Sequence, residues 1–407
     1  MAKRKVKVIK KVRSHIRRAH IRKLKGGKTV PVKKARVKSF EKGYYVNEGN
    51  VFVTRYIGNK RKLVGIIKKQ VPNDAQRFMD AFAGSGVVGY VLSMDGKQVL
   101  ANDILRMSYH LNRAILQNKR VKLSEEDVEM LLRPTKAEKA QKLWKNKYLT
   151  PGILEVIDDI RANAEKLSGY KKDIALAALA SAMVRTQPFG HFEVTKKAEV
   201  YKHERARRDM NKERFIQLFK EEVERINSLV GTPGKGKVWR MDVVRALERA
   251  KKSFKPDVVY FDPPYITEYN AINYERKLSP VELVLSNFRD PKFLAWEEER
   301  VNKFQNLNRK NINEFFSSFI NASKGIPTVI VSYVEHGYPR KEEIKEMLNE
   351  AGYRVRVIEI PHHYSLGATA ENKEATELLF VAKLKKKRVG NSRKKKVGVS
   401  RKKKLKS

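Results

Sequence analysis

Cysteine is absent from the chain. This excludes disulfide bonds and cysteine-ligated zinc, and it is typical of proteins in a reducing cytoplasm. No apolar run approaches the roughly 18 residues that a membrane-spanning helix needs. The basic N-terminus is not followed by an apolar stretch, so we expect no secretory signal. The sequence therefore predicts a cytoplasmic protein without a membrane partner.

Acidic residues are missing from both ends of the chain. Residues 1–40 hold 17 lysines and arginines with no acid, and residues 383–407 hold 14, out of a net charge of +44. Such an excess favours a polyanionic partner, and nucleic acid is the first candidate. A basic run can equally be a solvated segment with only nonspecific affinity, and the composition leaves both readings open.

The two basic ends differ in pattern. The stretch HIRKLKGGKTVPVKKARV alternates basic and apolar residues around Lys25-Gly-Gly-Lys28, which predicts a hairpin within the extension 1–40. The other end repeats KKKRVGNS, RKKKVGVS and RKKKLKS. This low-complexity stretch cannot bury a core, so residues 383–407 are expected to be a disordered tail that could follow phosphates.

Strand-like and helix-like patterns alternate in the remaining chain. Strands are expected at 77–83, 98–101, 237–241, 257–261, 328–332, 354–360 and 377–382. Helical spacing lies between several of them, including 104–118 and 341–351. This alternation predicts an α/β fold with a largely parallel sheet and helices on both faces.

Residues 119–230 break this alternation, because they are long, charged and almost free of strand patterns. Within them, 173–185 has the composition of a buried helix. We interpret 119–230 as a helix-rich insertion, and 41–118 together with 231–382 as one catalytic domain.

The segment Asp80-Ala-Phe-Ala-Gly-Ser-Gly86 follows an expected strand and opens an expected helix. Gly84 and Gly86 would let the backbone approach a ligand closely, beside a helix N-terminus that favours an anionic group. The spacing is not the GxGxxG dinucleotide pattern, and it would suit a nucleoside with an amino-acid arm. An ordinary turn between a strand and a helix is the alternative.

Two further acids lie at expected strand ends. Asp103 follows the glycine loop by about 20 residues, the position at which doubly wound folds bind ribose hydroxyls. Asp242 follows a later strand. Ligands of such folds lie outside the carboxyl ends of the strands, so these side chains are expected around one site.

The tetrapeptide Asp262-Pro-Pro-Tyr265 ends the strand at 257–261. Each proline removes a backbone N–H and fixes φ, so the chain leaves the sheet rigidly. The Asp262 side chain and the Pro263 carbonyl become two fixed acceptors, which suit the exocyclic amine of a base. The Tyr265 ring could stack on that base, worth about 1–3 kcal/mol. A Pro-Pro turn that only closes a strand is the alternative.

The motifs YIGNKRKL (56–63), DAFAGSG (80–86), AND (101–103), MD (241–242) and DPPY (262–265) occur in one order. In that order they resemble the adenine-specific DNA methyltransferases of the Dam-like and type II restriction–modification class. The resemblance covers most of 50–382 and extends to SYVEHGYP (332–339) and ELLFVAK (377–383). It implies a Rossmann-like sheet, S-adenosylmethionine as methyl donor, DNA as substrate, and a cognate restriction endonuclease as a candidate partner.

The resemblance also implies roles for individual residues. Tyr56 and Lys60 match the N-terminal cofactor motif. Asp80, Gly84 and Gly86 would surround the methionine part of the cofactor. Asp103 would hold its ribose, and Asp242 would lie near its adenine. Asp262, Pro263 and Tyr265 would grip the target adenine after it leaves the duplex stack. The insertion 119–230 occupies the place of the family's target-recognition region.

Other functions remain open from the sequence. A methyltransferase of the same fold could act on RNA or on another amino group, and a basic nucleic-acid-binding protein could carry a vestigial cofactor pocket. The absence of cysteine counts against methylation of a cytosine ring carbon, which needs a thiolate. His191, His336, His362 and His363 lack metal-ligand spacing, so no metal is expected. Phe315 and Phe316 are expected in the core, and Ser332 either in the core or at the pocket.

Overall fold

The computed structural model describes residues 21–23, 29–31, 58–145, 147–187, 190, 192, 210–268, 273–299, 306–364 and 373–385. The chain divides into two units, residues 1–44 and 45–407. Tyr56, most of the C-terminal tail and the stretch 193–209 lie outside the described residues. The disorder expected for the tail therefore stays an expectation.

In the first unit, strand β1 (Ile21–Lys23) pairs with β2 (Thr29–Pro31) in antiparallel register, with Ile21 opposite Pro31. This pair corresponds to the hairpin expected around Lys25–Lys28, although residues 24–28 between the strands are outside the described part.

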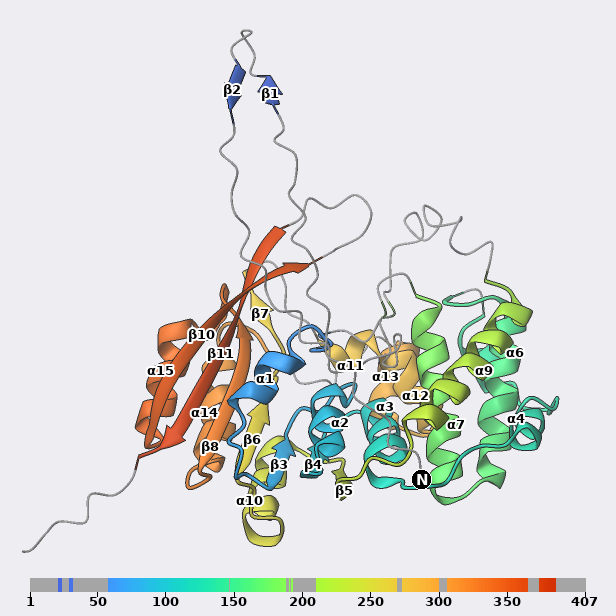
Figure 1. Cartoon of the computed structure of the whole chain (residues 1–407). Coiled ribbons are helices and arrows are strands. Elements are labelled where there is room, and N and C mark those ends of the chain that lie inside the picture. Colours follow the sequence, from blue (N-terminus) through green and yellow to red (C-terminus); the bar gives the residue numbers. More distant parts are fainter. Residues whose placement is uncertain are drawn as a thin grey trace, which may run out of the picture. The chain divides into compact units, whose positions relative to one another are not determined.

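The second unit is built on a seven-stranded sheet with the order β10-β11-β8-β6-β3-β4-β5 (Figure 1). Its strands are β3 (Arg77–Asp80), β4 (Gln98–Asn102), β5 (Gly236–Trp239), β6 (Val258–Phe261), β8 (Thr328–Val334), β10 (Tyr353–Tyr364) and β11 (Lys373–Leu384). The strands from β8 to β5 are parallel, as predicted. Strand β11 runs antiparallel to both β8 and β10, because β10 and β11 form a hairpin at the edge.

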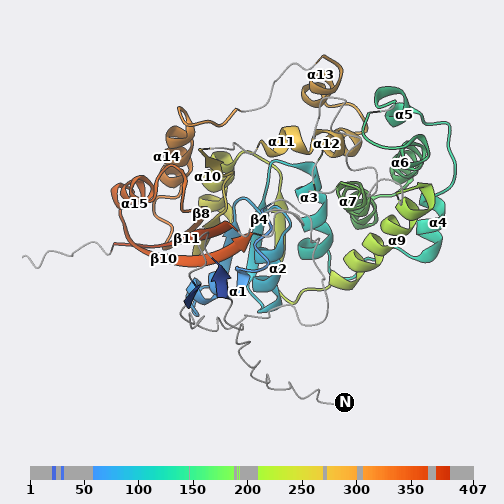
Figure 2. The same ribbon diagram turned by 90° about the horizontal axis from the view of Figure 1, so that it is seen from above.

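Side chains of the central strands alternate between two cores, which is why these strands read as continuous apolar runs. Phe78, Val258 and Tyr260 face the larger core, whereas Met79 and Val259 face the smaller one. Figure 2 shows α1 (Val64–Gln70) and α2 (Val87–Met94) on one side of the sheet. The other side carries α10 (Val243–Ser253), α14 (Ile312–Ala322) and α15 (Lys341–Glu350). Both faces are covered, as expected.

A group of helices lies beside the β5 edge (Figures 1 and 2). It contains α4 (Glu125–Leu131), α5 (Lys139–Leu143), α6 (Pro151–Asn163) with a short 3₁₀ turn (Ala164–Lys166), α7 (Gly169–Arg185) and α9 (Lys212–Leu229). Helix α7 is buried from Asp173 to Val184, which confirms the buried helix expected at 173–185. Helix α3 (Arg106–Asn112) contacts α7 through His110, whose Nδ1 lies 2.8 Å from Oδ1 of Asp173.

The helical group is larger than the stretch 119–230. Helices α12 (Ser279–Leu285) and α13 (Pro291–Glu299), preceded by the short α11 (Tyr274–Lys277), also join it. The buried Glu297 carboxylate accepts hydrogen bonds from Trp144 and Tyr148, and Arg161 donates to the Val284 carbonyl. These contacts link residues more than 100 positions apart, which no local pattern predicts.

Several element boundaries differ from the prediction, and β10 and β11 are both longer than the strands expected at 354–360 and 377–382. The strand expected at 77–83 ends at Asp80, because residues 81–83 turn toward the glycine loop. The helix expected at 104–118 begins at Arg106 and becomes a π-helical turn at Arg113–Gln117. No helix among the described residues is long and apolar enough to cross a bilayer.

Candidate active site

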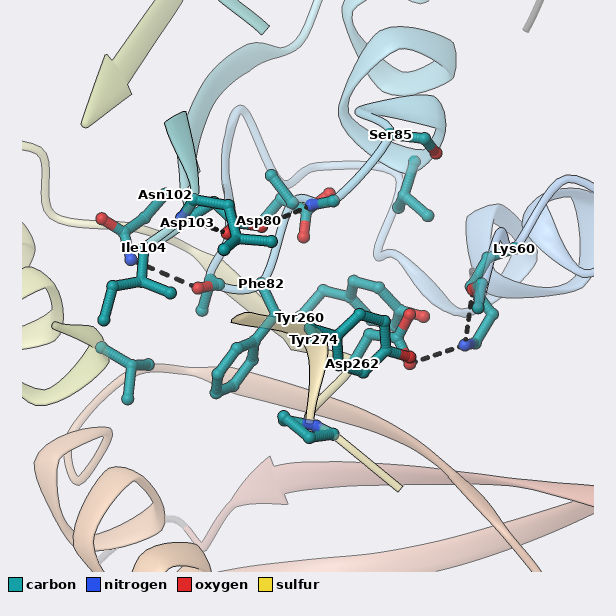
Figure 3. Close-up of a pocket in the computed structure, with 18 of the residues that line it drawn as sticks. Lys60, Asp80, Phe82, Ser85, Asn102, Asp103, Ile104, Tyr260, Asp262 and Tyr274 are labelled. Carbon is teal, nitrogen blue, oxygen red and sulfur yellow. Dashed lines mark hydrogen bonds and ion pairs between the residues drawn. The ribbon is translucent and has the colours of Figure 1, made fainter. Parts of the chain in front are cut away.

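A cavity lies at the carboxyl ends of β3, β4 and β6, the edge of a parallel sheet where ligands bind. Its walls include six of the residues singled out from the sequence: Lys60, Asp80, Gly84, Asp103, Asp242 and Asp262. Figure 3 shows four of these side chains around it. Gly86, Pro263 and Tyr265 are not part of the wall, whereas Pro264 is.

The glycine loop has the backbone geometry that requires glycine. Gly84 and Gly86 have φ values of +49° and +79°, and Gly86 is the N-cap of α2. A Cβ at Gly86 would come closer to Oδ1 of Asn112 than real Cβ atoms approach. Asn112, on α3, donates from Nδ2 to the Gly84 carbonyl at 3.2 Å. Asn112 therefore braces the loop, a role that the sequence analysis missed.

Asp103 holds the other side of this loop. Its Oδ2 accepts from the Gly84 amide at 2.8 Å, and its Oδ1 accepts from the Leu105 amide at 2.9 Å. Burial raises the pKa of Asp103, although these amide hydrogen bonds oppose the rise. The carboxylate thus shapes the loop as well as lining the cavity.

Asp80 is almost fully buried, and its Oδ1 has no hydrogen-bond partner among the described residues. Burial raises its pKa well above the ordinary value, and the charges of Asp262 and Asp103 raise it further. In the described part of the chain, Oδ1 of Asn102, which also lines the cavity, is likewise buried without a partner. Buried acceptors of this kind need a donor, so the cavity fits a cationic ligand with N–H groups. S-adenosylmethionine, with its ammonium and sulfonium, has that character.

Asp242 and the apolar wall complete the cavity. Asp242 caps α10 by accepting from the amides of Val244 at 2.9 Å and Arg245 at 3.2 Å. Phe82 and Phe315 contribute aromatic surface. Phe315, expected in the core, packs against the smaller core and also lines the cavity, whereas the neighbouring Phe316 is fully buried as predicted.

Lys60 and Asp262 both line the cavity and form an ion pair, with Nζ 2.6 Å from Oδ1 (Figure 3). Lys60 is 7% exposed and also lies 3.7 Å from Oε1 of Glu377. Burial lowers the pKa of Lys60, but Asp262 and Glu377 outweigh this and raise it. The ammonium is therefore firmly charged next to the DPPY carboxylate.

Asp262 receives three contacts at one oxygen. Besides Lys60, the hydroxyls of Ser332 at 3.2 Å and Tyr265 at 3.3 Å reach Oδ1. Burial raises the pKa of Asp262, and Lys60, Ser332 and Tyr265 oppose the rise. Among the residues that the structure describes, none of these contacts uses Oδ2. Ser332 is 1% exposed and is not part of the cavity wall, so it takes the core position of the two that the sequence left open, and its hydroxyl contacts Asp262 from there.

Tyr265 is fixed by a second buried carboxylate. Its hydroxyl donates to Oε1 of Glu377, which is 1% exposed on β11. The ring centre lies 4.8 Å from Nζ of Lys60 and packs edge-to-face against Tyr333 at 5.0 Å. The sequence analysis missed Glu377, because its contact with Tyr265 depends on β11 lying antiparallel beside β8.

A mostly parallel sheet, a glycine loop and acids at three strand ends together define an S-adenosylmethionine-dependent methyltransferase. Residues 56–329 match the model of the D12 class N6 adenine-specific DNA methyltransferases, and the chain belongs to this family. It transfers the methyl group of S-adenosylmethionine to the amino group of adenine in DNA, as predicted from the motifs.

The chain is also similar to individual known proteins. The chain is 29% identical over 340 residues to the type II methyltransferase M2.HphI of Haemophilus parahaemolyticus, covering 80% of this chain and 96% of that protein. It is 43% identical over 68 residues to M.FokI of Planomicrobium okeanokoites, covering 16% and 10%. Among solved structures, it is similar to the rRNA methyltransferase aviRa of Streptomyces viridochromogenes, with 14% identity, a TM-score of 0.26 and coverage of 82% and 90%.

Proposed function

We propose that the cavity at the carboxyl ends of β3, β4 and β6 is the methyl-transfer site. The residues of this site divide into two groups. The first group would hold S-adenosylmethionine and contains Tyr56, Lys60, Asp80, Gly84, Gly86, Asp103 and Asp242. The second would hold the target adenine and contains Asp262, Pro263 and Tyr265. The observation that carries the proposal is that Asp80, with its unpartnered oxygen, and Asp262 line the same cavity from neighbouring strands.

S-adenosylmethionine supplies an electrophilic methyl group on a positively charged sulfur. The chain's part is to bind that charge and to orient it. Asp80 offers a buried acceptor with no other partner, and the Gly84–Gly86 turn leaves room for close approach. Phe82 and Phe315 give the cavity an apolar wall that excludes water around the charge.

The adenine amino group is a weak nucleophile, because its lone pair is delocalised into the ring. Oδ2 of Asp262 and the Pro263 carbonyl would accept its two N–H groups and direct the lone pair out of conjugation. Lys60, charged and 2.6 Å from Oδ1, favours the carboxylate form of Asp262 by opposing the rise in its pKa. Catalysis of this kind depends on orientation and electrostatics rather than on a covalent intermediate.

The proposal also covers DNA recognition, a partner protein and the cellular location. The helical group that includes 119–230 is proposed to recognise the target sequence, and the basic ends to hold DNA. A cognate restriction endonuclease and a cytoplasmic location complete it, supported by the type II relatives and the cysteine-free composition.

The central experiment is transfer of labelled methyl groups to duplex DNA by Asp262→Ala. We expect near-complete loss of transfer, with S-adenosylmethionine affinity in calorimetry changed only a few-fold. The matched control is Asp74→Ala, an exposed acid before the amino end of β3, with normal transfer. Turnover of Asp262→Ala close to that of the control would refute the assigned role, and label in RNA alone would overturn the substrate.

A further inference from the structure

The guanidinium groups of two arginines contact the ring of Tyr338, in a strand that pairs with β7 (Ile266–Thr267), directly after the tetrapeptide Asp262–Tyr265. The Cζ atoms of Arg309 and Arg340 lie 4.4 Å and 4.0 Å from the ring centre of Tyr338. Arg340 also donates to the Tyr338 hydroxyl at 2.6 Å. We name Arg309, Tyr338 and Arg340 the Tyr338 clamp. The ring holds two like charges together, which cation–π attraction stabilises by only about 0.5–1 kcal/mol at an exposed site.

The clamp is poorly neutralised by the protein itself. Arg309 approaches one acid, Glu268, at 3.6 Å, and both side chains are about half exposed, so this pair contributes little. Within the described residues, no carboxylate forms an ion pair with the guanidinium of Arg340. An arrangement that brings two cations together without a strong counter-charge is prepared for an external anion.

The clamp is connected directly to the catalytic tetrapeptide. Tyr338 lies in β9 (Gly337–Tyr338), which pairs with β7 (Ile266–Thr267), and β7 begins immediately after Tyr265. Buried Tyr333 joins the two: its hydroxyl accepts from the Ile266 amide at 3.1 Å and donates to the Tyr338 carbonyl. An anion on the clamp would therefore be held at a fixed offset from Tyr265.

We propose that the Tyr338 clamp binds a DNA backbone phosphate beside the extruded adenine. Guanidinium groups match phosphate oxygens in geometry and charge, and phosphate contacts position a protein on its duplex without reading sequence. Extruding a base rotates the sugar–phosphate backbone. A phosphate contact close to the tetrapeptide Asp262–Tyr265 would therefore hold the rotated nucleotide in place. The inference rests on the DNA methyltransferase activity and adds the point at which the backbone is held.

The test compares Arg309→Gln, Arg340→Gln and the double variant with Arg249→Gln. Arg249 is the matched control, because it is an exposed arginine stacked on Trp239 at 4.6 Å but belongs to α10. Affinity for duplex DNA that the wild type methylates is measured over a range of salt. A single shared phosphate predicts that the double variant lowers the magnitude of the slope of log K against log salt by about 0.9. Each single variant keeps one guanidinium on that phosphate and should lower it by less. The control should keep the wild-type slope.

Duplexes with one neutral methylphosphonate beside the target adenine identify the phosphate. The wild type should lose about tenfold in affinity at one position, and the double variant should lose nothing further there. S-adenosylmethionine affinity should stay unchanged in every variant. An unchanged salt slope in the double variant, or an equal loss in Arg249→Gln, would overturn the clamp while leaving methyl transfer intact. A wild type that methylates no DNA would instead refute the activity itself.

Discussion

The ammonium nitrogen of Lys60 lies 2.6 Å from a carboxylate oxygen of Asp262, although the two residues are 202 positions apart in sequence. Lys60 precedes α1, and Asp262 follows β6, so the pair closes the cavity between the N-terminal motif and the catalytic tetrapeptide. The family resemblance assigned Lys60 to the cofactor. Its contact with Asp262 adds a second role, because the ammonium opposes the rise that burial causes in the pKa of that carboxyl.

Replacing Lys60 by glutamine should separate these two roles. Burial raises the pKa of Asp262, and Lys60 is the main group that opposes the rise. Without the ammonium the pKa rises further, so the carboxylate forms only at higher pH. We expect the acidic limb of kcat against pH to move to higher pH and kcat at pH 7 to fall by about 10- to 100-fold.

Lys62→Gln is the control, because Lys62 is an exposed lysine on the same turn. It should keep the wild-type pH profile. A Lys60→Gln variant that weakens S-adenosylmethionine binding without moving the profile would favour the cofactor role instead.

Glu377 is expected to act by orienting Tyr265, since the tyrosine hydroxyl donates to its carboxylate. Glu377→Ala should lower kcat/KM for DNA by about 5- to 30-fold, the size of one to two kcal/mol for a buried hydrogen bond. Tyr265→Phe removes the same hydrogen bond from the other side. The double variant Tyr265→Phe/Glu377→Ala should therefore be little worse than either single variant. Fully additive losses would show that the two residues act independently.

Much of this site follows from local sequence. An apolar run followed by an acid identifies a strand end, and parallel strands bring such ends to one edge, so Asp80, Asp103 and Asp262 could be expected together. Glu377 could not, because its place depends on β11 lying antiparallel beside β8, with Glu377 opposite Val334. Asn112 was missed for a similar reason: it acts on the glycine loop from a different helix. Contacts that depend on how distant elements close on each other leave no periodic signal.

Asp80→Asn should test whether the buried carboxylate binds a cation. Burial first, and then the charges of Asp262 and Asp103, raise the pKa of Asp80 well above its ordinary value. A bound cation favours the ionised form, so cofactor affinity should rise with pH as protons are displaced from the site. Asp80→Asn should bind S-adenosylmethionine at least tenfold more weakly.

Calorimetry in buffers of different ionisation enthalpy measures this displacement directly. The wild type should release protons on binding, and Asp80→Asn should release fewer. Equal proton release by the two proteins would mean that another group is responsible.

Glu282 carries a carboxyl group on α12 that is 1% exposed, and its titration should make the free energy of unfolding depend on pH. Its oxygens accept from the amides of Arg106 at 2.8 Å and Met107 at 2.9 Å, where α3 begins. Burial raises its pKa from 4.5 to about 7, although these amides oppose the rise. Because the folded pKa lies above the unfolded one, its protonation stabilises the fold fully below pH 4.5, and this stability is lost as pH rises through 7.

Denaturant unfolding of the wild type and Glu282→Gln at pH 6 and pH 8.5 measures this contribution. The wild type should lose about 1 kcal/mol more free energy of unfolding between these pH values than the variant does. The glutamine variant should be less stable overall, because one amide oxygen cannot replace both acceptors, so the comparison rests on the pH slope and not on absolute stability. Identical slopes in the two proteins would show that Glu282 does not titrate in this range.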